Sequence, residues 1–393
     1  MPERLPVPAY GRAALSDLLP AVLASLGVPG EADALELPPA RRAVVLLVDG
    51  LGSRLLARAR DAAPFLSSLA QRTLTAGFPT TTATSLASLG TGLTPGEHGV
   101  TGYTSVLDEV GTSVAWLTWT SAPVLTARAA PRGDAGQDLR ERLVPEQMQP
   151  RPTAFERAAA AGVAVTVAAP AAYEGSGLTH AVLRGGRHAG AVTPGDALAH
   201  VVAASRLGER SLAYCYTPDL DLTGHVRGVA GPAWVSQLRL VDAFAEQLAA
   251  ALPPGVALHV TGDHGMVDVP EQARVDADRV EALQEGVRAL AGDPRARHVH
   301  CEPGASDDVH AAWTAELGAG WEVLRRDEVV AAGLLGPRVA ERHRSRIGDL
   351  VAVATGLGAV VRSQAEPQLS RLRGQHGALT DDELLVPLLT SAG

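Results

Sequence analysis

A hydroxyl-rich segment at residues 78–85 carries the first candidate chemistry in the sequence. It reads Phe-Pro-Thr-Thr-Thr-Ala-Thr-Ser and leads into a small-residue stretch that we expect to be a helix. The free N–H groups and the dipole at a helix start favour an anion. A hydroxyl there could attack phosphorus while the helix end holds the phosphate oxygens. The same hydroxyls also make ordinary helix caps, and the segment on its own favours capping over catalysis.

Six possible metal ligands change that balance, because each follows an expected strand or lies in a glycine-flanked turn. They are Asp49, Asp221, His225, Asp263, His264 and His376. The carboxyl ends of parallel strands meet at one edge of a sheet, so we expect the six to converge beside Thr82. A mixed set of carboxylates and imidazoles suits zinc. Six such ligands and a hydroxyl suffice for two metal ions, which can clamp the attacking and leaving oxygens of an in-line displacement.

Each ligand also has an ordinary structural reading. Asp49-Gly50 could be a turn that ends a strand, and Asp263-His264-Gly265 could be a hairpin turn. Asp221 and His225 could form a local pair, with Gly224 favouring a loop over a helix. Independent turns at all six positions become implausible when their order along the chain is considered.

Short continuous apolar runs predict the elements that must position these groups. Runs at 43–48, 163–169, 211–216 and 256–260 are typical of buried parallel strands, and helical segments lie between them. The alternation predicts an α/β fold with a mostly parallel central sheet flanked by helices. We expect a strand at 348–354 to rejoin this sheet and a helix to end the chain at 381–389. Residues 1–40 are interpreted as a surface arm with one short helix.

After residue 271 the pattern of expected strands and helices changes, which predicts a small α/β insert. The expected division is residues 1–271 as the first part of a catalytic core, 272–335 as an inserted cap subdomain, and 336–393 as the last part of the core.

Composition limits the kinds of partner. The 393 residues carry a net charge of −9, which argues against an extended nucleic-acid or anionic-membrane surface. The two cysteines imply no disulfide framework. The N-terminus lacks a signal-peptide pattern and no run approaches the roughly 18 apolar residues of a membrane span, so we expect a cytoplasmic protein.

Taken in order, the motifs resemble those of the alkaline phosphatase superfamily, and most closely the nucleotide pyrophosphatase/phosphodiesterase family. The resemblance spans residues 43–377. It rests on Val-Asp-Gly at 48–50, the hydroxyl segment through Thr-Gly at 91–92 and His-Gly at 98–99, Pro-Asp-Leu-Asp-Leu-Thr-Gly-His at 218–225, Gly-Asp-His-Gly at 262–265 and Gly-Gln-His-Gly at 374–377. It implies an alkaline phosphatase-like fold.

The resemblance also implies a role for each matching residue. Thr82 would be the nucleophile and form a covalent phosphoryl-threonine. The Thr82 oxygen would share one zinc ion with Asp49, Asp263 and His264. The other zinc ion would be held by Asp221, His225 and His376.

Ser85 departs from the family pattern, since many phosphodiesterases of this family have an asparagine three residues after the nucleophile. We expect the Ser85 hydroxyl to bind the substrate phosphate there, although it is shorter and reaches differently. No clear aromatic clamp for a nucleobase is visible. Tyr103, Trp116 and Trp119 are candidates, but core packing is favoured for them.

The sequence as a whole predicts a two-zinc hydrolase of phosphodiester or pyrophosphate bonds in a small phosphate ester or nucleotide. Phosphomonoester or phosphonate hydrolysis at the same bimetal site is the alternative. A catalytically inactive metal-binding scaffold is the contrasting class, and the intact ligand set argues against it. The sequence leaves the oligomeric state open.

Overall fold

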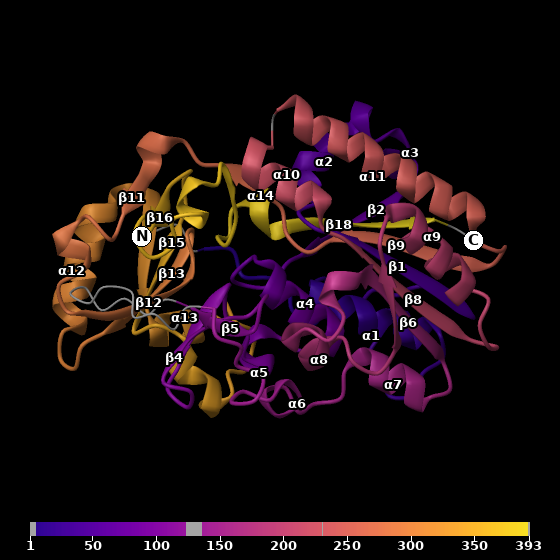
Figure 1. Cartoon of the computed structure of the whole chain (residues 1–393), viewed down its shortest axis with the longest axis horizontal. Helices are drawn as coiled ribbons and strands as arrows, with labels where there is room; N and C mark the ends of the chain where they lie inside the picture. The colour runs from indigo at the N-terminus through magenta and orange to yellow at the C-terminus, as the bar shows by residue number, and fades with distance from the viewer. Residues whose placement is uncertain (1–4, 123–135, 230, 392–393) are drawn as a thin grey trace.

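The computed structural model describes residues 5–122, 136–229 and 231–391. Its largest element is a seven-stranded sheet, here called the main sheet (Figure 1). From edge to edge its strands are β2 (Ala70–Thr75), β18 (Leu385–Ser391), β9 (Val256–Gly262), β1 (Arg42–Val48), β8 (Ser211–Thr217), β6 (Ala164–Pro170) and β7 (Arg187–Ala191). The five strands from β9 to β7 are parallel, and β18 runs antiparallel to both of its neighbours. This confirms the predicted α/β fold with a mostly parallel sheet.

The central strand β1 shows why a continuous apolar run forms a buried parallel strand. Its side chains alternate between two hydrophobic cores, with Val45 and Leu47 in one and Val44 and Leu46 in the other. Helices cover both faces, so neither face of the strand can carry polar residues.

Two layers of helices enclose these cores (Figure 1). One layer contains α1 (Leu15–Ser25), α4 (Thr82–Thr91), α7 (Ala154–Ala160) and α8 (Gly177–Val182). The other contains α2 (Ser53–Arg58), α3 (Pro64–Ser68), α9 (Pro194–Ala204) and α11 (Pro232–Ala251). The expected surface arm is wrong for α1, because its apolar side chains are part of the first core. No helix within the described ranges is long and apolar enough to cross a membrane.

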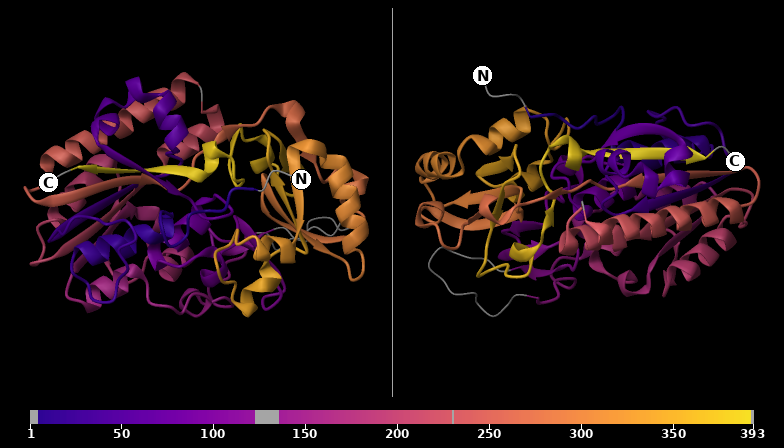
Figure 2. Two further views of the ribbon diagram at one scale, coloured as in Figure 1. Left: turned by 180° about the vertical axis from the view of Figure 1, so that it is seen from behind. Right: turned by 90° about the horizontal axis from the view of Figure 1, so that it is seen from above.

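A second sheet of four antiparallel strands lies at one end of the main sheet (Figure 2). Its order is β12 (Val287–Asp293), β13 (Ala296–Cys301), β15 (Leu350–Ala354) and β14 (Trp321–Arg325). Together with α12 (Ser306–Leu317) and α13 (Arg326–Ala331) it builds a core of its own. The prediction that 348–354 rejoins the main sheet is therefore wrong, because β15 pairs with β13 and β14. The insert at 272–335 stays a proposal. The second sheet also contains β15, which lies after residue 335 in the sequence.

Two further local predictions are wrong. The C-terminal segment forms the short helix α14 (Asp381–Leu384) and then β18, because a seven-residue segment that begins with five apolar residues fits between β2 and β9 as a strand. Periodicity alone cannot separate such a run from a buried helix. Residues 219–227 form helix α10 (Asp219–Arg227) despite Gly224. A side chain at Gly224 would meet the Met266 sulfur at 2.6 Å, so close packing explains the glycine.

Short elements complete the surroundings of the main sheet. A meander of β3 (Thr104–Leu107), β4 (Thr112–Ala115) and β5 (Thr120–Ala122) follows α5 (Pro95–His98), and α6 (Pro145–Met148) precedes α7. The two-residue strands β10 (Val267–Asp268) and β17 (Gly374–Gln375) pair with each other. A further pair joins β11 (Arg274–Asp276) to β16 (Ala359–Val361). The β10–β17 pair fixes the segment that precedes His376.

Candidate active site

Strand register brings the first carboxylates to one edge of the main sheet. Val48 lies between Thr217 and Gly262 in the ladder, so Asp49 and Asp263 follow neighbouring strands at the same level. The Asp263 Oδ1 atom accepts hydrogen bonds from the amides of Gly50 and His264, at 2.9 and 3.0 Å. These bonds hold the Asp263 carboxylate in place through one of its two oxygens.

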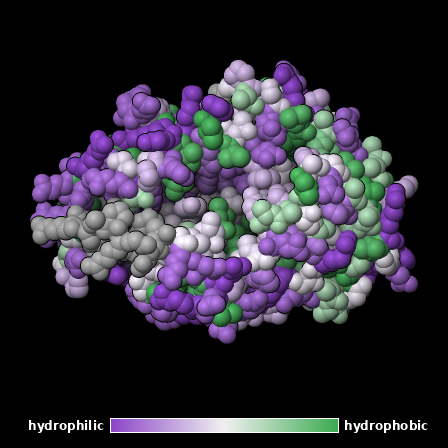
Figure 3. All heavy atoms as spheres, in the orientation of Figure 1, coloured by the Kyte–Doolittle hydropathy of each residue, from purple (hydrophilic) through white to green (hydrophobic). Residues whose placement is uncertain are grey.

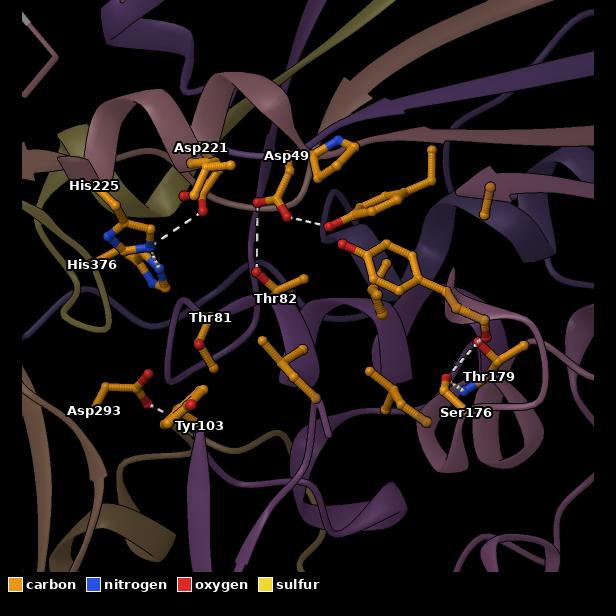
Figure 4. A pocket seen from close by; sticks show the side chains of 18 of the residues that line it. Asp49, Thr81, Thr82, Tyr103, Ser176, Thr179, Asp221, His225, Asp293 and His376 are labelled. Atoms are coloured by element: carbon orange, nitrogen blue, oxygen red, sulfur yellow. Dashed lines mark hydrogen bonds and ion pairs between the residues drawn. The ribbon is translucent and has the colours of Figure 1, made fainter. Parts of the chain in front are cut away.

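Thr82 lies among the first group of possible ligands (Figure 4). Its Oγ1 atom is 3.2 Å from His264 Nε2 and 3.5 Å from Asp49 Oδ1. His264 Nε2 is also 3.5 Å from Asp263 Oδ2. One ligand atom from each of Asp49, Asp263 and His264 lies within 4.8 Å of the others. The Thr82 hydroxyl therefore lies beside a buried trio of two carboxylates and one imidazole.

Helix α10 and the turn after β17 supply the second group. Asp221 and His225 are one helical turn apart, and Asp221 Oδ2 lies 3.2 Å from His225 Nε2. The His225 Nδ1 atom contacts the Gly374 carbonyl at 2.8 Å, and His376 Nδ1 contacts the Thr80 carbonyl at 2.8 Å. The two Nε2 atoms then face each other at 3.3 Å. Asp221, His264 and His376 form a second trio within 4.8 Å.

Among the described residues that line the cavity beside this cluster there is no lysine or arginine to balance its carboxylates. Burial, together with the carboxylates of Asp263 and Asp221, raises the pKa of Asp49 well above its usual range. Burial and two neighbouring imidazoles lower the pKa of His376 well below its usual range. His225 would also be lowered by burial, but the Asp221 carboxylate raises its pKa.

A bound cation would satisfy the groups that the protein leaves without partners. Within the described residues, Asp263 Oδ2 and Asp221 Oδ1 are buried oxygens with no hydrogen-bond partner. Such orphaned acceptors are costly, and each belongs to one of the two trios. The donor set of carboxylate oxygens and imidazole nitrogens therefore fits divalent metal ions.

Thr82 is also the first residue of α4, as the sequence suggested. Thr81 is the N-cap residue in an extended conformation, and its side chain makes no cap hydrogen bond. The first turn of a helix presents amides without partners inside the helix, so this end favours an anion. The Gly92 that ends α4 has a φ of 71°, a left-handed conformation that glycine adopts easily.

Ser85 lies one turn further along α4, where it anchors the helix. Its hydroxyl is fully buried and donates to the Asp263 carbonyl at 2.7 Å. Ser85 is not among the residues that line the cavity beside Thr82. This position supports a structural link between α4 and the end of β9, and the phosphate contact of Ser85 stays a prediction.

A cavity of about 390 Å³ opens beside the two trios. Figure 3 shows the surface hollowed near its centre, between the parts that hold the two sheets. Besides Asp49, Thr82, Asp221, His225 and His376, the wall includes the apolar and aromatic side chains Leu86, Leu117, Tyr173, Leu178, Leu183 and Leu222. Such a wall suits the apolar part of a small ligand.

The aromatic candidates of the sequence divide in two. Trp116 and Trp119 are fully buried and pack edge to face at 5.2 Å, which confirms core packing for both. Tyr103 instead lines the cavity, so core packing is wrong for it. Tyr173 lines the cavity as well, and its ring centroid lies 6.0 Å from that of Tyr216. The sequence analysis had singled out neither Tyr173 nor Tyr216.

Sequence reasoning also missed two polar contacts of the cavity wall. The Tyr216 hydroxyl donates to Asp49 Oδ2 from strand β8. Asp293 reaches the cavity from the second sheet. The position of Tyr216 five residues before Asp221 was a possible signal, whereas nothing local marks Asp293.

Comparison with known proteins places this geometry in a family. The family model of type I phosphodiesterase / nucleotide pyrophosphatase matches residues 43–379. A search of curated proteins found no match.

Solved structures share the fold at low sequence identity. Murine ectonucleotide pyrophosphatase / phosphodiesterase 5 matches with a TM-score of 0.67 at 19% identity, over 88% of this chain and 87% of that one. An inactive form of the murine protein in complex with AMP matches with a TM-score of 0.68, at the same identity and coverage. Phosphonoacetate hydrolase from Sinorhizobium meliloti 1021, in complex with phosphonoformate, matches with a TM-score of 0.66 at 20% identity, over 90% of both chains.

The fold and the family match define an enzyme that hydrolyses phosphoric ester bonds, built on an alkaline phosphatase-type α/β core. Within that class, the chain belongs to the type I phosphodiesterase / nucleotide pyrophosphatase family.

Proposed function

We propose that this protein hydrolyses phosphodiester or pyrophosphate bonds with Thr82 as its nucleophile. The observation that carries the proposal is the placement of Thr82 Oγ1, 3.2 Å from His264 and 3.5 Å from Asp49 at the start of α4. A hydroxyl that only capped the helix would bond to the helix amides, and neither Thr81 nor Thr82 does so in the described structure.

Two divalent metal ions, assigned as zinc, are part of the proposal. One is assigned to Asp49, Asp263, His264 and the Thr82 oxygen, and the other to Asp221, His225 and His376. When bound, such ions supply Lewis acidity and lower the pKa of a coordinated hydroxyl or water. Two orphaned carboxylate oxygens support a cation at each place, since Asp263 Oδ2 belongs to the first trio and Asp221 Oδ1 to the trio with His264 and His376. His225 joins the second assignment because its Nε2 atom lies 3.2 Å from Asp221 Oδ2 and 3.3 Å from His376 Nε2.

The protein's own groups perform a two-step displacement in this proposal. Thr82 loses its proton to solvent, and its oxygen forms a bond to phosphorus while the bond to the leaving oxygen breaks. The departing oxygen takes a proton from water, and Thr82 carries the phosphoryl group as an ester. Water then attacks phosphorus, the bond to the Thr82 oxygen breaks, and Thr82 regains a proton. The amides at the start of α4 hold the phosphate oxygens in both steps.

The cavity supports a small phosphate ester or nucleotide as the substrate. Its apolar wall can receive the organic part, while the polar end holds the phosphorus. Phosphomonoesters and phosphonates remain the alternative substrates, since the same two groups of ligands could act on them. A cytoplasmic location and the lack of nucleic-acid and membrane partners stay predictions from the sequence.

Turnover of matched esters tests the proposed function. The zinc-loaded enzyme is assayed with an aryl methyl phosphodiester, the corresponding aryl phosphomonoester and phosphonoacetate, beside the variant Thr82→Ala. We expect the wild type to prefer the diester and Thr82→Ala to lose at least about a thousandfold in turnover, as an essential nucleophile requires.

Thr84→Ala is the matched control, because Thr84 lies on the same turn of α4 but donates to the Val100 carbonyl. It should keep wild-type turnover per folded molecule. Full activity in Thr82→Ala would refute the nucleophile, and a preference for the monoester or the phosphonate would move that alternative to first place.

A further inference from the structure

A carboxylate of the second sheet faces the cavity of the main sheet. Asp293 is the last residue of β12, and it is followed by Pro294, the first residue of the turn that leads into β13. Both residues line the cavity that contains Thr82. In Figure 4, Asp293 and Asp49 lie on opposite sides of Thr82, with Thr81 on the side of Asp293.

The contacts of Asp293 hold its side chain in this place. It is 2% exposed, and its Oδ2 atom accepts a hydrogen bond from the Tyr103 amide at 3.1 Å. The Thr81 hydroxyl, one residue before Thr82, also bonds to it. The start of α4 is thus joined directly to the hairpin of the second sheet.

Asp293 forms no ion pair within the part of the chain that the structure describes. The two arginines of its hairpin, Arg295 and Arg297, are committed to Glu383 at 2.7 Å and to Glu366 at 2.6 Å. Among the described residues of the cavity wall there is no lysine or arginine, and the carboxylates are Asp49, Asp221 and Asp293. Asp49 and Asp221 are assigned to the two proposed metal ions, so Asp293 is the carboxylate of this wall whose negative charge no assigned metal ion balances.

Asp293 carries this charge at alkaline pH. Burial raises the pKa of Asp293 to about 6, against the lowering effect of the Tyr103 amide, the Thr81 hydroxyl, Arg297 and His264. The carboxyl is therefore ionised at pH 8, although it is almost fully buried.

We propose that Asp293 selects substrates by charge, favouring phosphodiesters, which carry one negative charge, over phosphomonoesters, which carry two. This inference rests on the proposed function and names the substrate class of the same site. A phosphomonoester has a second pKa near 6, so it is a dianion at pH 8, whereas a diester stays a monoanion. The extra charge of the monoester meets the repulsion of Asp293 in a site of reduced dielectric. In general, one extra charge about 10 Å from a carboxylate weakens affinity by roughly 15-fold at an effective dielectric near 20, and by more at shorter separations.

The variant Asp293→Asn tests this selection. Asparagine keeps an oxygen that can accept from Tyr103 and Thr81 but removes the charge. With one aryl leaving group in both esters at pH 8, we expect the ratio of kcat/KM for the monoester to kcat/KM for the methyl diester to rise at least about tenfold, because the variant relieves one charge repulsion for the diester and two for the monoester. Inhibition by inorganic phosphate, also largely a dianion at pH 8, should strengthen by at least about tenfold.

Asp242→Asn is the matched control, because Asp242 is likewise a buried carboxylate that accepts two backbone amides, those of Phe65 and Leu66. It lies away from the cavity and should leave the ratio of the two kcat/KM values unchanged. If Asp293→Asn folds poorly, Asp293→Ser supplies a second neutral variant with an acceptor oxygen.

The outcomes separate the inference from the proposed function. A diester-to-monoester ratio that stays at the wild-type value in a folded neutral variant would overturn the selection and leave Asp293 as an anchor between the hairpin and α4. Equal losses on both esters would overturn it in the same way. Failure of the proposed function shows instead as wild-type enzyme inactive on both esters, and phosphate binding by calorimetry then still tests the charge effect.

Discussion

Replacing Tyr216 by phenylalanine should weaken one metal site without disturbing the fold. Tyr216 donates its hydroxyl hydrogen to Asp49 Oδ2, while Asp49 Oδ1 faces Thr82 and His264. The hydrogen bond fixes which oxygen of Asp49 points to the proposed metal. Phenylalanine keeps the ring that packs against Tyr173.

The magnitude follows from the kind of contact that is lost. Hydrogen bonds that orient metal ligands typically contribute 10- to 100-fold to metal affinity, or about 1.4 to 2.7 kcal/mol. We therefore expect one of the two zinc equivalents to bind about 10- to 100-fold more weakly in Tyr216→Phe, and the other to bind as in the wild type. Activity at saturating zinc is a poorer readout, since Tyr216 also lines the cavity.

A competition titration measures this effect. Metal-free enzyme is titrated with zinc against a chromophoric chelator, and the two equivalents are fitted separately. Tyr214→Phe is the matched control, because the Tyr214 hydroxyl is buried two residues away on β8 and has no hydrogen-bond partner in the described structure. Wild-type affinity at both sites in Tyr216→Phe, or an equal loss in Tyr214→Phe, would refute the reasoning.

Three further predictions concern metal, a buried ion pair and pH. Removing metal with a chelator should abolish turnover and lower the unfolding temperature, because the clustered carboxylates lose their counter-charge. Added zinc should restore the turnover and the unfolding temperature. An unchanged melting curve after chelation would count against a metal site. Glu383→Gln should cost about 3 to 5 kcal/mol of unfolding free energy, because it removes the carboxylate that lies 2.7 Å from the fully buried Arg295 guanidinium. Urea unfolding measures this loss, and a loss below about 1 kcal/mol would contradict the prediction. Burial, with Arg326 nearby, lowers the pKa of His298 to about 4, below the unfolded value near 6.5. The contribution of His298 to stability is therefore fully present above about pH 6.5, where the imidazole is neutral in both states. This contribution of up to about 3 kcal/mol is lost as the pH falls to 4, because the unfolded chain binds the proton first. Urea titrations across that range should show a flatter pH dependence for His298→Gln, and parallel curves for variant and wild type would disprove the assignment.

The sequence predicted the parts of the fold that depend on local pattern. The run at 43–48 is apolar at every position because β1 is buried on both faces, whereas a strand with one solvated face would alternate apolar and polar residues. Once such strands are placed, parallel topology brings Asp49 and Asp263 to one edge without knowledge of any contact. This is why the ligand cluster beside Thr82 could be anticipated.

Where pattern is ambiguous, tertiary contacts decide the structure. Residues 385–391 are apolar enough for either a helix or a strand, and the space between β2 and β9 selects the strand. Gly224 suggested a loop, yet its small size serves the close packing of α10 on Met266. Neither outcome can be read from the segment itself.

Asp293 illustrates the remaining limit of sequence reasoning. It is the last residue of a strand in a different sheet, and only the folding of the chain brings it to Thr81 at the start of α4. Ser85 is the reverse case, because its hydroxyl is close to Thr82 in sequence but bonds to the Asp263 carbonyl. Sequence distance along the chain says little about which side chains face a cavity between two sheets.

The most direct test of the Thr82 nucleophile is mass spectrometry of the rapidly acid-quenched enzyme during turnover of an aryl methyl phosphodiester. We expect a methylphosphoryl adduct that peptide mapping places on Thr82 and that is absent from Thr82→Ala. Sustained turnover with no adduct on Thr82, and with activity retained in Thr82→Ala, would contradict the account.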